Sequence, residues 1–155
     1  MSVSWTIQIL VDSSTKPFSK TSKYGESAAC WAIYTSEIAS LPEYVGLVYR
    51  PKEGPNKIFY IGIIRALEEL AESQYVEYLL KIRGDCQPVI DQLNGKWRAV
   101  EMKPLYDQVK SLEEKIKKNK RAQIEYDYLG EDDNVYKKID QCAKQFRELI
   151  KKRLF

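Results

Sequence analysis

The chain has 155 residues, of which 44% are hydrophobic and 30% charged, and its formal net charge is +3. This composition is typical of a soluble globular protein, and we expect one domain over residues 1–155 with its core at about 4–150. Histidine is absent, which excludes serine or cysteine nucleophiles activated by histidine and most zinc hydrolases.

Three apolar segments joined by loops open the chain. Residues 5–12 alternate in the manner of a strand that ends at Asp12, and a polar loop is expected over 13–23. Residues 27–34 and 44–49 predict two further strands, so the three together predict an antiparallel meander. A single Asp at a strand end is usually a turn residue, and it gains meaning only if other carboxylates end neighbouring elements.

The period then becomes helical over residues 58–71, and a short strand over 78–83 closes on Gly84 and Asp85. Helices over 87–93 and 104–118, a strand over 123–129 and a last helix over 136–153 complete the order β-β-β-α-β-α-α-β-α. Helical crossovers make the later strands parallel to their neighbours. We therefore predict an α/β fold, a five-stranded mixed sheet with helices on both faces.

Four segments of the sequence carry a resemblance to a known family. They are Asn56 to Leu70 with its Ala-Leu-Glu ending, Leu80 to Asp85 with its terminal Gly-Asp, Val89 to Arg98 continued by Leu105 to Leu112, and Asn134 followed by Ile139 to Ala143. In this order, over roughly Ile7 to Lys144, they resemble the type I ribonuclease H proteins of the reverse-transcriptase-like branch. The resemblance implies a ribonuclease H-like fold. In that family, four carboxylates hold two Mg²⁺ (or Mn²⁺) ions that cleave the RNA strand of an RNA–DNA hybrid.

The resemblance assigns three of these carboxylates. Asp12 would bridge the two ions, Asp85 would bind one of them, and Asp140 would bind the other. Two extra residues separate Asp140 from Asn134 relative to the family pattern, so Asp132 and Asp133 are alternatives for the third ligand.

The fourth carboxylate of the family is a glutamate early in the first long helix, where this chain has Phe59. Glu68 and Glu69 lie nine and ten residues further on, about 13–15 Å along a helix, which is too far to replace it. The sequence therefore predicts a nucleic-acid-binding protein in which hydrolysis is weak or lost. Two alternatives stay open: an active, divergent Mg²⁺-dependent hybrid ribonuclease, and a non-catalytic protein-interaction scaffold.

Basic and aromatic residues indicate where a nucleic acid, an RNA–DNA hybrid or double-stranded RNA, would bind. Lys96, Trp97, Arg98 and Lys103, together with the basic run 115–121, predict a basic handle with an aromatic platform. The alternative is that Trp97 packs between helices while the lysines solvate a helix end. Asn56 matches a family position that touches the RNA sugar, and Asn134 matches one near the last helix.

Cysteine usage and the chain's start bear on the compartment. Three cysteines at wide, irregular spacing indicate neither a disulfide framework nor a zinc site. The start lacks the basic and apolar pattern of a signal peptide, and no segment has the roughly 18–20 apolar residues of a membrane span. We therefore expect an intracellular protein, in cytoplasm or nucleus, without a membrane partner.

Overall fold

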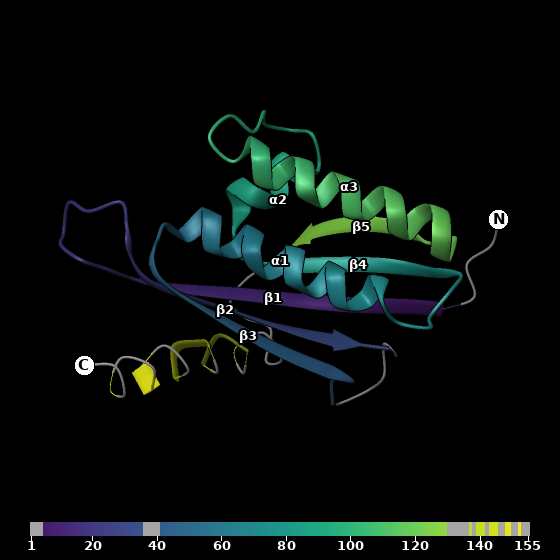
Figure 1. The fold of residues 1–155 in the computed structure, drawn as a ribbon, viewed down its shortest axis with the longest axis horizontal. Helices are drawn as coiled ribbons and strands as arrows, with labels where there is room; N and C mark the ends of the chain where they lie inside the picture. Colours follow the sequence, from purple (N-terminus) through teal and green to yellow (C-terminus); the bar gives the residue numbers. More distant parts are fainter. Residues whose placement is uncertain are drawn as a thin grey trace.

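The computed structural model describes residues 5–35 and 41–129, together with residues 137, 139–141, 143–145, 148–149 and 152. The described strands form a five-stranded sheet in the order β3-β2-β1-β4-β5 (Figure 1). β1 (Trp5–Pro17), β2 (Gly25–Tyr34) and β3 (Tyr44–Glu53) pair antiparallel in succession. β4 (Tyr78–Gly84) pairs parallel with both β1 and β5 (Gln123–Tyr128). The predicted mixed sheet, a meander followed by parallel strands, is confirmed.

Helices cover both faces of this sheet, as predicted. α1 (Pro55–Ala71), α2 (Gln87–Leu93) and α3 (Lys103–Lys120) lie on one face (Figure 1). The described residues between 137 and 152 are helical and lie on the other face, where Ile139 and Ala143 pack against Leu10 and Cys30. None of the described helices is long and apolar enough to cross a bilayer.

α1 is the central helix of the larger core. It begins directly after Gly54 with Pro55 in its first turn, where the missing N–H of proline costs no helical hydrogen bond. Its apolar residues recur at helical spacing and have almost no exposed surface, and they pack against the inner side chains of β1, β2 and β4. These buried residues are Ile58, Phe59, Tyr60, Gly62, Ile63, Ala66, Leu67 and Leu70.

The first strand is longer than the sequence indicates. A loop was expected from Ser13 onward, but β1 continues past Asp12 to Pro17 and pairs with β2 as far as Gly25. Polar contacts favour this extension: Thr15 and Ser27 are paired in register, and their hydroxyl oxygens lie 2.9 Å apart. Asp12 therefore does not end its strand, and the prediction that it does is wrong.

Candidate nucleic-acid interface and acidic edge

Two of the predicted carboxylates, Asp12 and Asp85, meet where the pairing of β1 with β4 ends. We call this end of the sheet the acidic edge. The parallel pairing of β1 with β4 ends at the pair Val11–Gly84, so Asp12 of β1 and Asp85, the first residue after β4, follow side by side. Asp12 has no exposed surface and is paired with Cys30 of β2, whereas Asp85 is half-buried. Asp12 thus marks the point where the parallel ladder stops, although its own strand continues.

Phe59 occupies the inner side of this edge. The side chain is fully buried, and a Cβ on Gly84 would overlap its ring and lie 2.8 Å from the Val11 carbonyl oxygen. The ring therefore packs directly on the glycine that precedes Asp85. Large Phe59 and small Gly84 are complementary in volume, which explains why the strand ends with a glycine at this point.

Asp140 lies on the helix that covers the opposite face. The neighbouring residue Ile139 belongs to the same apolar cluster as Leu10. The Asp140 carboxylate oxygen Oδ2 is 3.0 Å from the Lys144 ammonium. Among the described residues, no three acidic or cysteine side chains come close enough to hold a metal ion together. Asp132, Asp133 and Asn134 lie outside the described residues.

These donors can be compared with the magnesium site that the resemblance implies. Carboxylate oxygens are the ligands that Mg²⁺ prefers, and Asp12 and Asp85 supply such oxygens at one edge. A third described carboxylate does not join them, and the apolar Phe59 ring packs on Gly84 next to Asp85. The described residues therefore do not fit a complete two-metal site.

Asn56 lies beside the acidic edge, in the first turn of α1. Its side-chain oxygen accepts a hydrogen bond from the Cys86 thiol at 3.3 Å, and Cys86 follows Asp85 directly. Burial raises the pKa of the Cys86 thiol to about 11, and the nearby Asp85 carboxylate adds to the rise. Cys86 is therefore a neutral thiol at physiological pH, which holds Asn56 next to Asp85 and is poorly suited to act as a nucleophile.

The basic handle follows α2, which begins two residues after Asp85 and whose seven residues span about 10 Å. Gly95 ends the turn after α2 with a φ of 78°, a left-handed conformation that favours glycine. The next backbone N–H groups, of Lys96 and Trp97, both donate to the Asp91 carbonyl, at 2.9 and 3.4 Å. This tight turn sets where the handle side chains leave the backbone.

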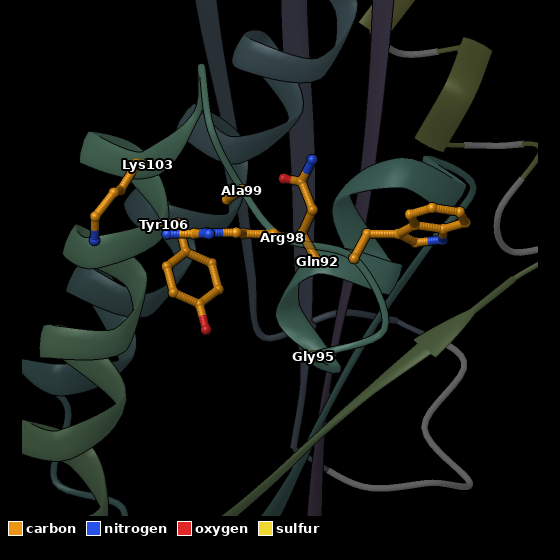
Figure 2. Close-up of a pocket in the computed structure, with 7 residues that line it drawn as sticks. Gln92, Gly95, Arg98, Ala99, Lys103 and Tyr106 are labelled. Atoms are coloured by element: carbon orange, nitrogen blue, oxygen red, sulfur yellow. The ribbon is translucent and has the colours of Figure 1, made fainter.

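A pocket of about 380 Å³ lies between this turn and the first part of α3 (Figure 2). Figure 2 shows Arg98 reaching from the connection toward Tyr106 of α3, with Lys103 on the same helix. The lining residues are Gln92, Gly95, Trp97, Arg98, Ala99, Lys103 and Tyr106. The pocket thus combines two cations, two aromatic rings and an amide.

Trp97 is 66% exposed, so the alternative that it packs a helix junction is wrong. Lys103 makes an exposed ion pair with Asp107 at 3.2 Å, and such a pair is worth little in water and leaves the ammonium available to a phosphate. The second basic run does not join this handle. It lies at the other end of α3, and twelve residues of helix separate Lys103 from Lys115 by about 18 Å.

The sequence matches no protein-family profile and no curated protein sequence. Solved structures do match its fold. Ribonuclease H1 from the halophilic archaeon Halobacterium salinarum is 18% identical, with a TM-score of 0.73 over 90% of this chain and 96% of that one. The N-terminal ribonuclease H domain of a Mycobacterium tuberculosis protein is 18% identical, with a TM-score of 0.71 over 93% and 98%. The chain has the ribonuclease H fold.

A third match, LC11-RNase H1 solved in complex with an RNA/DNA hybrid, is 15% identical with a TM-score of 0.71, over 90% of this chain and 94% of that one.

Within the ribonuclease H fold, the structure also adds residues that sequence patterns did not single out. Gln92 lines the handle pocket and accepts a hydrogen bond from the buried Tyr60 hydroxyl at 2.6 Å. Tyr106 forms a wall of the same pocket. Their helical spacing alone indicated only core or surface positions.

Proposed function

We propose that this ribonuclease H-fold protein binds RNA–DNA hybrids and that its hydrolytic activity is weak or lost. The observation that carries the binding proposal is the handle pocket, which is lined by Arg98, Lys103 and the exposed Trp97 and follows Asp85 in the chain after the seven residues of α2. Cations neutralise backbone phosphates, and an exposed aromatic ring offers an apolar face to a sugar of the backbone. That a protein of similar fold was solved with an RNA/DNA hybrid supports this choice of partner.

The proposal of weak hydrolysis rests on Phe59. An apolar ring with no exposed surface stands early in α1, at the position that the family resemblance assigns to a metal-binding glutamate. The ring packs so closely on Gly84 that a Cβ there would overlap it. Loss of an outer-sphere partner of a metal ligand typically reduces metal affinity or activity 10- to 100-fold, and we expect loss of a ligand itself to reduce it further.

Binding can be tested by fluorescence anisotropy with a blunt RNA–DNA hybrid of about one helical turn or more, over a series of salt concentrations. Removal of one phosphate-contacting cation lowers the magnitude of the slope of log K against log salt by about 1. We expect this change for Arg98→Ala, and a roughly two- to fivefold loss of affinity for Trp97→Ala, whose exposed ring can bury apolar area against a sugar of the hybrid. Lys118→Ala, which removes an equal charge from the far end of α3, is the matched control and should leave both quantities unchanged.

A hybrid that binds without any dependence on Trp97 or Arg98 would contradict the proposed interface. Absence of salt-dependent binding by the wild-type protein would contradict nucleic-acid binding itself and favour the scaffold alternative.

One observation favours the alternative of an active enzyme. The register of β1 and β4 brings Asp12 and Asp85 to one edge, where a Mg²⁺ ion could find two of its carboxylate ligands. Cleavage of a labelled hybrid in Mg²⁺ or Mn²⁺ that disappears in Asp12→Asn supports this alternative. Equal, background cleavage in both proteins supports lost hydrolysis.

A further inference from the structure

The hairpin that joins β1 and β2 extends past the acidic edge. β1 continues five residues beyond Asp12, which corresponds to about 16 Å of extended chain. Figure 1 shows this hairpin projecting beyond the rest of the sheet, on the side where α1 begins. Core packing does not explain the length of this hairpin, because residues 16–21 are exposed to solvent.

The tip of this hairpin, residues 18–24, is closed by its own hydrogen bonds. The Phe18 N–H donates to the Tyr24 carbonyl at 3.2 Å, and the Ser22 N–H donates to the Ser19 carbonyl at 3.2 Å. The Ser22 hydroxyl also donates to the Tyr24 carbonyl at 2.9 Å. The tip therefore has a defined shape in which Phe18 and Tyr24 face each other across the mouth of the loop.

Both of these aromatic side chains are exposed, Phe18 by 57% and Tyr24 by 51%. Exposed lysines, Lys20 and Lys23, lie between them in the loop, and residues 18–24 contain no acidic side chain. Exposed aromatic rings with interleaved cations suit a strand whose bases are unstacked, since each base offers a face for stacking while the cations meet phosphates. The bases of a duplex are already stacked and offer no such face.

A cavity of about 640 Å³ lies between the tip and the starts of α1 and α3. Lys23 and Tyr24 form one side of it, and Asn56 and Lys57 at the start of α1 form another. Two acidic residues also line the cavity: Glu53, which pairs with Lys57 at 3.1 Å, and the exposed Glu101. A strand that leaves the Asn56 position can therefore follow this hollow to the hairpin tip.

We infer that the tip of the β1–β2 hairpin binds a single-stranded extension of the nucleic acid, by stacking bases on Phe18 and Tyr24 and by pairing phosphates with Lys20 and Lys23. The inference rests on the proposed function for the position of the duplex. It adds a second contact, and it predicts that a hybrid with a single-stranded flank is preferred over a blunt one.

The experiment measures the affinity of the full chain for three probes: a blunt hybrid, the same hybrid with a ten-nucleotide single-stranded flank, and that flank alone. We expect the flanked hybrid to bind the wild type roughly tenfold more tightly than the blunt one, which corresponds to one or two stacked bases. The double substitution Phe18→Ala with Tyr24→Ala should abolish this advantage and leave blunt-hybrid affinity within twofold. Tyr44→Ala, which removes a half-exposed aromatic ring near the opposite end of the sheet, is the matched control and should preserve the advantage.

The probes separate the two proposals. Blunt-hybrid binding without a flank advantage overturns the hairpin inference and keeps the proposed function. Binding of the isolated flank that depends on Phe18 and Tyr24, without blunt-hybrid binding, keeps the hairpin inference and overturns hybrid recognition. A flank advantage that survives the double substitution overturns the hairpin inference, and absence of binding to all three probes overturns both proposals.

Discussion

Phe59 fills a space that has no room for a hydrated carboxylate. Its side chain is fully buried among apolar residues and the Gly84 backbone. Phe59→Glu therefore places a carboxyl in an apolar environment, and we expect it to lower the free energy of unfolding by about 3 kcal/mol or more. Phe59→Leu, which keeps an apolar group, should cost only about 1–2 kcal/mol. Urea unfolding at pH 7 measures both values.

Phe59→Glu also bears on function, because it introduces the residue type that the family resemblance implies at this helix position. If this variant were as stable as wild type and cleaved the hybrid in Mg²⁺, the Phe59 ring would not be needed for packing, and its presence alone would account for the lack of hydrolysis. We expect instead that the substitution alone does not create an active site, since the side chain at position 59 is fully buried and packs on Gly84.

Gly84 and Phe59 should be energetically coupled. A Cβ on Gly84 would overlap the Phe59 ring, so Gly84→Ala in the wild type should cost about 1–3 kcal/mol, the usual range for overpacking. The cost should be smaller in a Phe59→Leu background, where the ring is absent. It should not vanish, because the same Cβ would lie 2.8 Å from the Val11 carbonyl oxygen. A double-mutant cycle by urea unfolding measures this coupling, and additive free energies would contradict the contact.

Most elements could be predicted from the sequence because periodicity reports which face is buried. The predicted helix of residues 87–93 agrees with α2 at both ends. Most other described helices and strands differ from their predicted bounds by a few residues, whereas β1 and β3 extend further than predicted at their C-terminal ends. The extension of β1 to Pro17 could not be predicted, because Ser, Thr and Lys residues suit loops and strands equally well. What decides it is the partner strand, through contacts such as that of Thr15 with Ser27.

The site was predictable in part for the same reason. The proximity of Asp12 and Asp85 follows from parallel pairing of their strands, which crossovers imply. The burial of Asp12 and the fit of Phe59 against Gly84 depend on three elements at once, and spacing along one segment does not contain that information. The two basic runs fall at opposite ends of α3, and helix length already separates them.

α3 ends on a residue in the left-handed conformation. Arg121 caps the helix with φ 52° and ψ 45°, and its guanidinium makes an ion pair with Glu77 at 2.6 Å. Left-handed backbone costs an L-residue about 1–2 kcal/mol, whereas glycine adopts it readily at a helix end. Because both substitutions remove the same exposed ion pair, we expect Arg121→Gly to be about 1 kcal/mol more stable than Arg121→Ala. Thermal unfolding of the two variants measures the difference, and equal midpoints would show that the cap is unstrained.

The residues of the acidic edge lie at one end of the sheet, and aromatic packing marks the opposite end, which we call the closed end. Asp12 and Asp85 lie where the parallel ladder of β1 with β4 stops, with Asn56 beside them. At the start of β4, Trp5 and Tyr78 make an edge-to-face contact with ring centroids 5.9 Å apart. The two ends can therefore be tested separately, since substitutions at the closed end should change stability and leave nucleic-acid affinity intact.

Tyr78 at this closed end links stability to alkaline pH. Burial raises the pKa of its phenol from 10.0 to about 12 in the folded protein. The folded state thus holds this proton more tightly than the unfolded state does. The contribution to stability is fully present below pH 10 and is lost as pH rises from about 10 to 12. At about 1.4 kcal/mol per pKa unit, this loss is on the order of 2–3 kcal/mol.

Tyr78→Phe removes the titrating group and keeps the ring against Trp5. Because the Tyr78 hydroxyl has no hydrogen-bond partner among the described residues, its removal should leave stability at pH 7 unchanged or slightly higher. Between pH 10 and 12 the variant should lose roughly 2 kcal/mol less than wild type. Urea midpoints across this range measure the difference, with Tyr44→Phe, a half-exposed tyrosine, as control. Parallel pH profiles for wild type and Tyr78→Phe would mean that the phenol is already solvated in the folded protein, and the closed end would then be open to water.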